Sequence, residues 1–168
     1  MMRNAERGQS LVEFALVLPI FLMLLVAVFD IGHVVWANDA LASAAEEATR
    51  YAIVHGGSES TTCPVGPPAP TARTSDFDAD CAFPSPSREA VRDAARRWLN
   101  GVGGDAVISV CYGAVAHCAG DVDQPNATNA RGTPVTVSIS ARLSLAAPSL
   151  LGIGPIGISA SSTMLVNH

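Results

Sequence analysis

The longest pattern in the chain is an apolar run close to the N-terminus. Residues 14–29 contain no charged side chain. A helix that rises about 1.5 Å per residue needs roughly 20 apolar residues to cross a hydrocarbon core roughly 30 Å thick. Residues 9–31 reach that length, and we therefore expect them to form a transmembrane helix.

Two residues within this expected span are unusual. Glu13 places an ionisable group in an apolar run, where a charge is costly and suggests a function. The alternative interpretation is that Glu13 lies at the headgroup boundary and is only tolerated there. Pro19 removes one intrahelical hydrogen bond, so we expect a neighbouring helix to approach the freed carbonyl.

Beyond the span the helical pattern continues. Apolar and small residues recur every three or four positions, which predicts one buried stripe on a helix: Val34, Ala37, Leu41, Ala44, Ala45, Ala48, Tyr51 and Ala52. No proline follows Pro19 before Pro64, and Gly56 supplies a stop signal. We expect one helix over residues 10–55, with residues 32–55 outside the membrane. Its stripe would pack on this protein's own domain, on another surface, or on both.

The remaining residues, 56–168, are expected to form one small domain. Residues 56–86 are rich in Gly, Ser, Thr and Pro and indicate a long surface loop. Ser85 and Pro86 are typical of a helix start, and Gly101 is typical of a stop. The arginines of this short helix, Arg88, Arg92, Arg96 and Arg97, are expected to face solvent, although a cluster of them could bind an acidic partner.

Strand patterns fill the C-terminal part of the chain. Residues 106–112 are expected to form a strand, and residues 135–145 alternate strictly between apolar and polar side chains. A prolyl break follows, and residues 156–166 suggest a returning strand. The predicted fold class is α+β: a long N-terminal helix packed on a small antiparallel sheet of about three strands, with one additional helix.

Composition and charge place the chain at a membrane and exclude nucleic acid as a partner. The chain has 168 residues, a formal net charge of −5 and only 15% charged residues, so no basic surface is available for phosphates. Arg3 and Arg7 precede the span, which predicts a cytoplasmic N-terminal segment (residues 1–8) and a domain on the other side. A signal peptide cleaved near Ala42 is the competing interpretation, but the apolar run is long for one.

Four cysteines, Cys63, Cys81, Cys111 and Cys118, all follow the apolar run. Their spacing does not form the close pairs that a zinc site needs, so we expect no metal. An even number of cysteines in a small domain beyond a membrane segment is typical of disulfides in an oxidising compartment. We favour the pairs Cys63–Cys81 and Cys111–Cys118, and the sequence leaves the other two connectivities open.

No arrangement of residues in the chain predicts catalysis. A phosphate-binding loop, a nucleophile elbow and paired carboxylates in an apolar setting are all missing from the sequence. Asp76, Asp78 and Asp80 alternate in the long loop, but the Gly and Glu of a calcium loop are missing, and a solvated acidic loop is preferred. We therefore expect no enzymatic activity and no cofactor.

The N-terminal stretch resembles a known family. The resemblance rests on Arg7-Gly8-Gln9-Ser10-Leu11-Val12-Glu13-Phe14-Ala15-Leu16-Val17-Leu18-Pro19, then Phe29-Asp30-Ile31-Gly32-His33 and Ala44-Ala45-Glu46-Glu47-Ala48-Thr49-Arg50-Tyr51-Ala52. This part, roughly the first third of the chain, is similar to the TadE/TadG-like minor pilins, or pseudopilins, of the tight-adherence (Flp-type) pilus.

The resemblance implies processing and assembly. In type IV-like prepilins an inner-membrane peptidase cuts after a glycine and leaves a glutamate at the fifth position. A cut after Gly8 would make Gln9 the first residue and Glu13 the fifth. Glu13 would then pair with the new amine of a neighbouring subunit, with Phe14 and Pro19 in the same assembly segment.

The implied function is that of a non-enzymatic minor pilin that acts in priming or at the tip of the pilus. The expected partners are pilin and other TadE-like subunits, the prepilin peptidase, the inner-membrane assembly platform and membrane lipid. The expected location is the inner membrane, in single-pass form, with incorporation into the pilus. The first alternative is a membrane-anchored adaptor or binding module that never joins a filament, and the second is a secreted enzyme.

Overall fold

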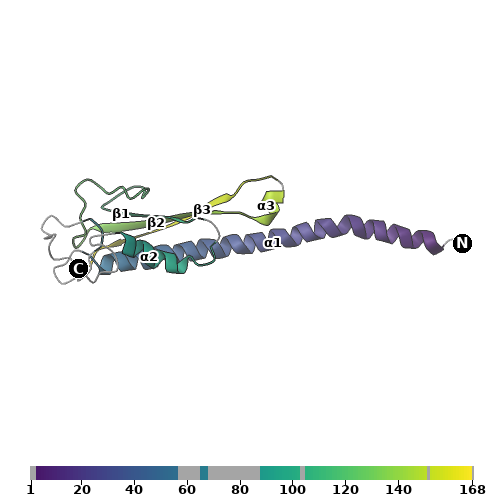
Figure 1. Ribbon diagram of the computed structural model, residues 1–168, viewed down its shortest axis with the longest axis horizontal. Coiled ribbons are helices and arrows are strands. Elements are labelled where there is room, and N and C mark those ends of the chain that lie inside the picture. Colours follow the sequence, from purple (N-terminus) through teal and green to yellow (C-terminus); the bar gives the residue numbers. More distant parts are fainter. Residues whose placement is uncertain (1–2, 57–64, 68–87, 103–104, 151, 168) are drawn as a thin grey trace.

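A computed structural model describes residues 3–56, 65–67, 88–102, 105–150 and 152–167. One long helix, α1 (Arg3–Val54), forms the axis of the molecule, and a small sheet covers its C-terminal half (Figure 1). The N-terminal half of α1 projects away from the domain without cover. The α+β fold with a long apolar helix on a three-stranded antiparallel sheet is confirmed.

The C-terminal half of α1 is buried through its small residues. Six residues of the expected stripe have no exposed surface: Ala37, Leu41, Ala44, Ala45, Ala48 and Ala52. Small side chains allow the sheet and a second helix to approach the axis of α1 closely. The stripe therefore packs on the protein's own domain, as expected. Thr49, buried in the same face, donates from Oγ1 to the Ala45 carbonyl at 2.6 Å.

The sheet has the strand order β1-β2-β3, and all of its pairs are antiparallel. Its strands are β1 (Val107–Tyr112), β2 (Pro134–Leu143) and β3 (Ile156–Leu165). Val137 at the centre of β2 pairs with Val110 on one side and Ser162 on the other. Apolar residues of β2 point towards α1, while its Ser and Thr residues lie on the opposite face. The period-2 pattern thus reports the buried face correctly.

Helix α2 (Glu89–Trp98) packs beside α1, and its arginines correct one expectation. Arg88 pairs with Asp123, and Arg92 pairs with Asp121 and with Glu89 of its own helix. The side chains of Arg88 and Arg92 are only 23% and 20% exposed. The expectation that they face solvent is therefore wrong, because acidic residues distant in sequence lie opposite them. Arg96 and Arg97 are exposed as expected.

A third helix was not expected from the sequence. Helix α3 (Ala146–Leu150) occupies the connection between β2 and β3, where the sequence predicts only a break. Five residues form too short a helix to be stable alone. The first N–H groups of α3 instead find acceptors on α1, as described below. The chain therefore has two helices besides α1 in its described part, not one.

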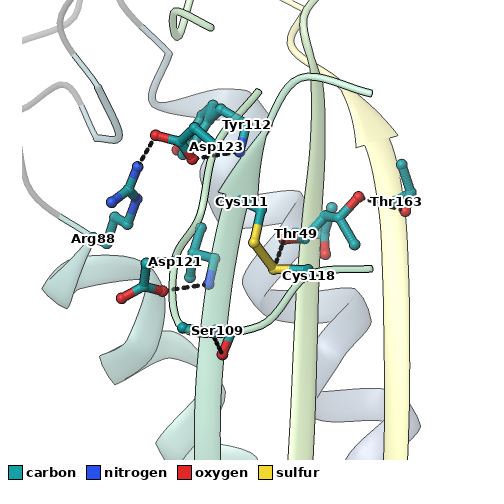
Figure 2. Close-up of a disulfide and its surroundings, with 12 residues drawn as sticks. Thr49, Arg88, Ser109, Cys111, Tyr112, Cys118, Asp121, Asp123 and Thr163 are labelled. Atoms are coloured by element: carbon teal, nitrogen blue, oxygen red, sulfur yellow. Dashed lines mark hydrogen bonds and ion pairs between the residues drawn. A yellow bond between two sulfur atoms is a disulfide. The ribbon is translucent and has the colours of Figure 1, made fainter. Parts of the chain in front are cut away.

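The segment that follows β1 turns back over the outer edge of that strand, and a disulfide holds it (Figure 2). Cys111 and Cys118 are bonded, which confirms one of the two favoured pairs. Asp121 Oδ1 accepts the Val110 N–H at 2.7 Å, and Asp123 Oδ1 accepts the Tyr112 N–H at 2.8 Å. Two carboxylates therefore close the edge of β1, which an incoming strand could otherwise extend.

Tyr112 is the largest fully buried side chain of the domain. Gly66 lies against its ring at φ +87°, and a Cβ built there would come within 2.2 Å of Tyr112 Cζ. The tyrosine hydroxyl is buried without a hydrogen-bond partner in the described residues. Burial raises the pKa of this phenol well above its ordinary value of about 10, against the opposing effect of the Arg88 charge.

Several expectations concern residues outside those the structure describes. They are the Cys63–Cys81 pair and most of the loop over residues 56–86, which includes Ser85 and Pro86. The acidic triplet Asp76, Asp78 and Asp80 lies outside as well. These expectations remain predictions. The helix that was expected to start at Ser85 and Pro86 begins at Glu89 instead, with Arg88 at its N-cap position.

Candidate functional site

The uncovered N-terminal half of α1 is the candidate functional surface. Every side chain from Gln9 to Leu25 is exposed, including many large apolar ones: Leu11, Val12, Phe14, Leu16, Val17, Leu18, Ile20, Phe21, Leu22, Met23, Leu24 and Leu25. Water-soluble surfaces rarely present an apolar patch of this extent, so lipid or another protein must cover it.

The length and composition of this helix are sufficient for a membrane span. Within Gln9–Val54, an 18-residue window reaches a mean hydropathy of 2.8, and none of that window is buried inside the molecule. The core helix of a soluble protein would pass the same test on hydropathy but would be mostly covered. The exposed half of α1 could therefore span a membrane, as the sequence predicts.

Glu13 is the one acidic residue among the exposed residues 9–25. Leu16 and Val17 follow it by one helical turn and are 68% and 56% exposed, so its carboxylate stands on an apolar face. Among the described residues the structure shows no hydrogen bond or ion pair to Glu13. A charged partner for this carboxylate would therefore have to come from outside the described residues.

The other residues expected to act in assembly lie on the same segment. Gly8 and Gln9 follow each other within α1, and Phe14 is 61% exposed next to Glu13. Helix α1 continues through Pro19 to its end at Val54. The structure thus places these four residues and Glu13 on one helix, and Gln9, Glu13, Phe14 and Pro19 lie in its exposed part. It does not bring Cys111 and Cys118 near them, since the disulfide lies on the sheet.

Asp30 is a structural residue that the sequence analysis did not identify. Its Oδ1 accepts the Ala146 N–H at 3.1 Å and its Oδ2 accepts the Ala147 N–H at 2.6 Å. These are the first N–H groups of α3, which have no partner within that helix. Asp30 therefore ties the β2–β3 connection to α1 where the apolar run ends. The position of this carboxylate at the end of an apolar run could have indicated a structural role for Asp30. The sequence does not indicate that its partners are the N–H groups of Ala146 and Ala147.

No metal centre accompanies this surface: the described residues contain no group of three or more His, Cys, Asp or Glu side chains placed to hold a metal ion. The ion pairs of the domain serve its own packing between α2 and the loop over β1. What the arrangement offers is an exposed apolar half of α1 on an α+β domain with a disulfide, and the Glu13 carboxylate on this helix half has no partner among the described residues.

One protein-family model matches most of helix α1. Residues 8–50 match the family model described as TadE-like protein, so the chain carries the TadE-like segment predicted from its sequence. The matched segment contains Gly8, Glu13 and Pro19 and extends into the packed half of α1. The match covers 43 of the 168 residues of the chain, so it identifies this segment and not the protein as a whole. No curated protein and no solved structure matches the chain.

Proposed function

We propose that this protein is a minor pilin that takes part in priming or in forming the tip of a tight-adherence pilus. Residues 9–31 would anchor it in the inner membrane, with residues 1–8 in the cytoplasm and the α+β domain outside the cell membrane. The observation that carries the proposal is Glu13, an unpaired carboxylate on an exposed apolar helix within the TadE-like segment.

Glu13 is proposed to fix the axial position of one subunit against the next. A cut after Gly8 would create an ammonium group on Gln9, four residues before Glu13. In a helical stack, the amine of one subunit can reach the carboxylate of its neighbour. Each charge offsets part of the desolvation cost of the other, and the pair has one geometry, so it sets the register.

The first experiment determines the mature N-terminus in cells that contain the prepilin peptidase. Mass spectrometry of the membrane and pilus fractions is expected to give a chain that begins at Gln9. An intact residue 1 on the protein in these fractions would contradict the processing step. A chain that begins near Ser43 would instead indicate a secreted protein and would contradict the membrane anchor.

The second experiment replaces Glu13 and compares the variant with a matched control. Removing one partner of a buried ion pair costs about 3–5 kcal/mol, which corresponds to a loss of roughly a hundredfold or more in incorporation. Glu13→Ala is therefore expected to disappear from sheared pili while its amount in the membrane is unchanged. Glu47→Ala makes the same chemical change on an exposed position of the same helix outside the span, and it should incorporate normally.

Normal incorporation of Glu13→Ala would refute the register role. The proposed partners are then tested by detergent extraction and affinity purification of the full chain. Recovery of pilin, other TadE-like subunits and the assembly platform supports a role in the pilus. Purification without any of them would favour the alternative of a membrane-anchored adaptor that stays outside the filament.

A further inference from the structure

The connection between β2 and β3 is an exposed apolar projection. It contains α3 and the turn after it, and three of its large side chains are largely uncovered: Leu150 (73% exposed), Ile153 (56%) and Ile156 (42%). The chain carries no charged residue from position 143 to position 167. We call residues 145–150 and 152–156 the hairpin tip. Loops that face water are normally polar, so the composition of this tip needs a physical reason.

The hairpin tip lies beside the C-terminal end of the expected membrane span. In Figure 1 the connection with α3 projects from the sheet towards the N-terminal half of α1. Asp30, near the end of the apolar run, accepts two N–H groups from the start of α3. Going towards the N-terminus, Val26 and Ala27 are the last partly covered residues of α1, and everything from Gln9 to Leu25 is exposed.

The depth of the tip follows from helix geometry. Helix α3 begins on Asp30, one position before the end of the expected span at residue 31. Its five residues, at about 1.5 Å each, can extend about 7 Å from that point. Membrane-surface segments bury their apolar side chains roughly 5–10 Å into the boundary between headgroups and acyl chains. The tip therefore reaches the depth at which exposed leucine and isoleucine side chains meet lipid.

We propose that the hairpin tip is a second membrane-contacting element, which inserts Leu150 and Ile153 into the leaflet on the domain's side of the bilayer. The inference rests on the proposed anchoring of α1 in a membrane. The tip is tied to α1 at Asp30, whose neighbours Phe29 and Ile31 are 76% and 65% exposed, so one lipid environment would cover both the tip and the span. The two N–H groups that Asp30 accepts compensate its charge at this boundary.

Lipid explains the observations better than a second protein surface does. Three backbone N–H groups of the tip are bonded within it: Ser149 to Leu145 O (3.2 Å), Gly152 to Ser149 O (3.1 Å) and Ile153 to Pro148 O (2.9 Å). Internal bonding of this kind is what a segment needs where water is scarce. The tip is also fixed to the span itself, so insertion of α1 places it at the interface without any partner protein.

The test places single tryptophans in the full chain, in vesicles of phosphatidylcholine and phosphatidylglycerol at a ratio of about 3:1. In a Trp36→Phe, Trp98→Phe background, Ile153→Trp reports on the tip. Leu22→Trp reports on the span, and Val122→Trp reports on an exposed apolar position of the loop over β1. Leu150→Trp is a second reporter of the tip in case one position disturbs the turn.

Vesicles made with brominated acyl chains quench tryptophans that contact lipid. Ile153→Trp is expected to show a blue-shifted emission maximum and to lose about half or more of its emission, as Leu22→Trp does. Val122→Trp should be quenched by aqueous acrylamide instead. If Leu22→Trp responds to lipid but both tip reporters behave like Val122→Trp, the inference is overturned and the anchor stands.

Two further outcomes also decide the matter. A blue-shifted tip reporter that brominated lipid does not quench would place the tip against protein, such as a second copy of this chain, and would overturn the inference. If Leu22→Trp itself responds only to acrylamide, the span is not in the bilayer. The proposed anchoring then fails, and the inference fails with it.

Discussion

The carboxylate of Asp123 is expected to hold the loop over β1 through two bonds at once. Its Oδ1 accepts the N–H of the fully buried Tyr112 at 2.8 Å, and its Oδ2 pairs with Arg88. Leaving a buried N–H without an acceptor costs about 1–3 kcal/mol. The ion pair adds about 1 kcal/mol, because both side chains are still 22–23% exposed and solvent screens them.

Asp123→Ala should therefore lower the free energy of unfolding by about 2–4 kcal/mol. Asp123→Asn keeps an oxygen for the Tyr112 N–H and loses mainly the ion pair, so about 1 kcal/mol is expected. Asp93→Ala is the matched control: it removes an exposed ion pair with Arg97 from α2 and should cost about 0.5 kcal/mol or less.

The assay is urea unfolding of the full chain in detergent micelles, followed by near-ultraviolet circular dichroism. Far-ultraviolet signals are dominated by α1, which the micelle keeps helical, so they would hide the unfolding of the domain. Hydrogen exchange at the Tyr112 amide gives an independent measurement and should accelerate in Asp123→Ala only. Equal costs for the Ala and Asn variants, with unchanged exchange, would refute the edge-closing role of this carboxylate.

Two further predictions concern the same end of the domain. Replacing Cys111 and Cys118 by serine should lower the free energy of unfolding by about 2.5 kcal/mol, which is the loop-closure contribution of a disulfide across so short a loop. The urea midpoint should fall accordingly, and an unchanged midpoint would contradict this prediction. Because burial raises the pKa of Tyr112, the folded state keeps its phenol proton at pH values where the unfolded chain loses it. The contribution of Tyr112 to the stability of the domain is therefore expected to be constant below about pH 10 and to fall above it. Tyr112→Phe, which also removes a hydroxyl that has no partner among the described residues, should abolish most of that fall, and a persistent loss would assign it to other groups.

The sequence alone determined the parts of the fold that depend on local periodicity. The apolar run of α1, the alanine stripe of its packed half and the alternation of β2 each report burial directly, because side-chain positions repeat every 3.6 residues in a helix and every two in a strand. The disulfide between Cys111 and Cys118 was also predictable, because the two cysteines are only seven positions apart and bracket one loop. The TadE-like segment was also readable, since it is one continuous stretch.

Only the tertiary structure decided which polar groups meet across long separations. Arg88 and Asp123 are 35 residues apart, and Asp30 and Ala147 are 117 apart. An arginine on a helix looks the same in sequence whether it faces water or an aspartate from a distant loop. Likewise, the five residues of α3 carry no helix signal of their own, and Asp30 supplies the acceptors that their first N–H groups need. Local pattern fixes which side of an element is apolar, whereas polar pairing depends on how the elements are placed in space.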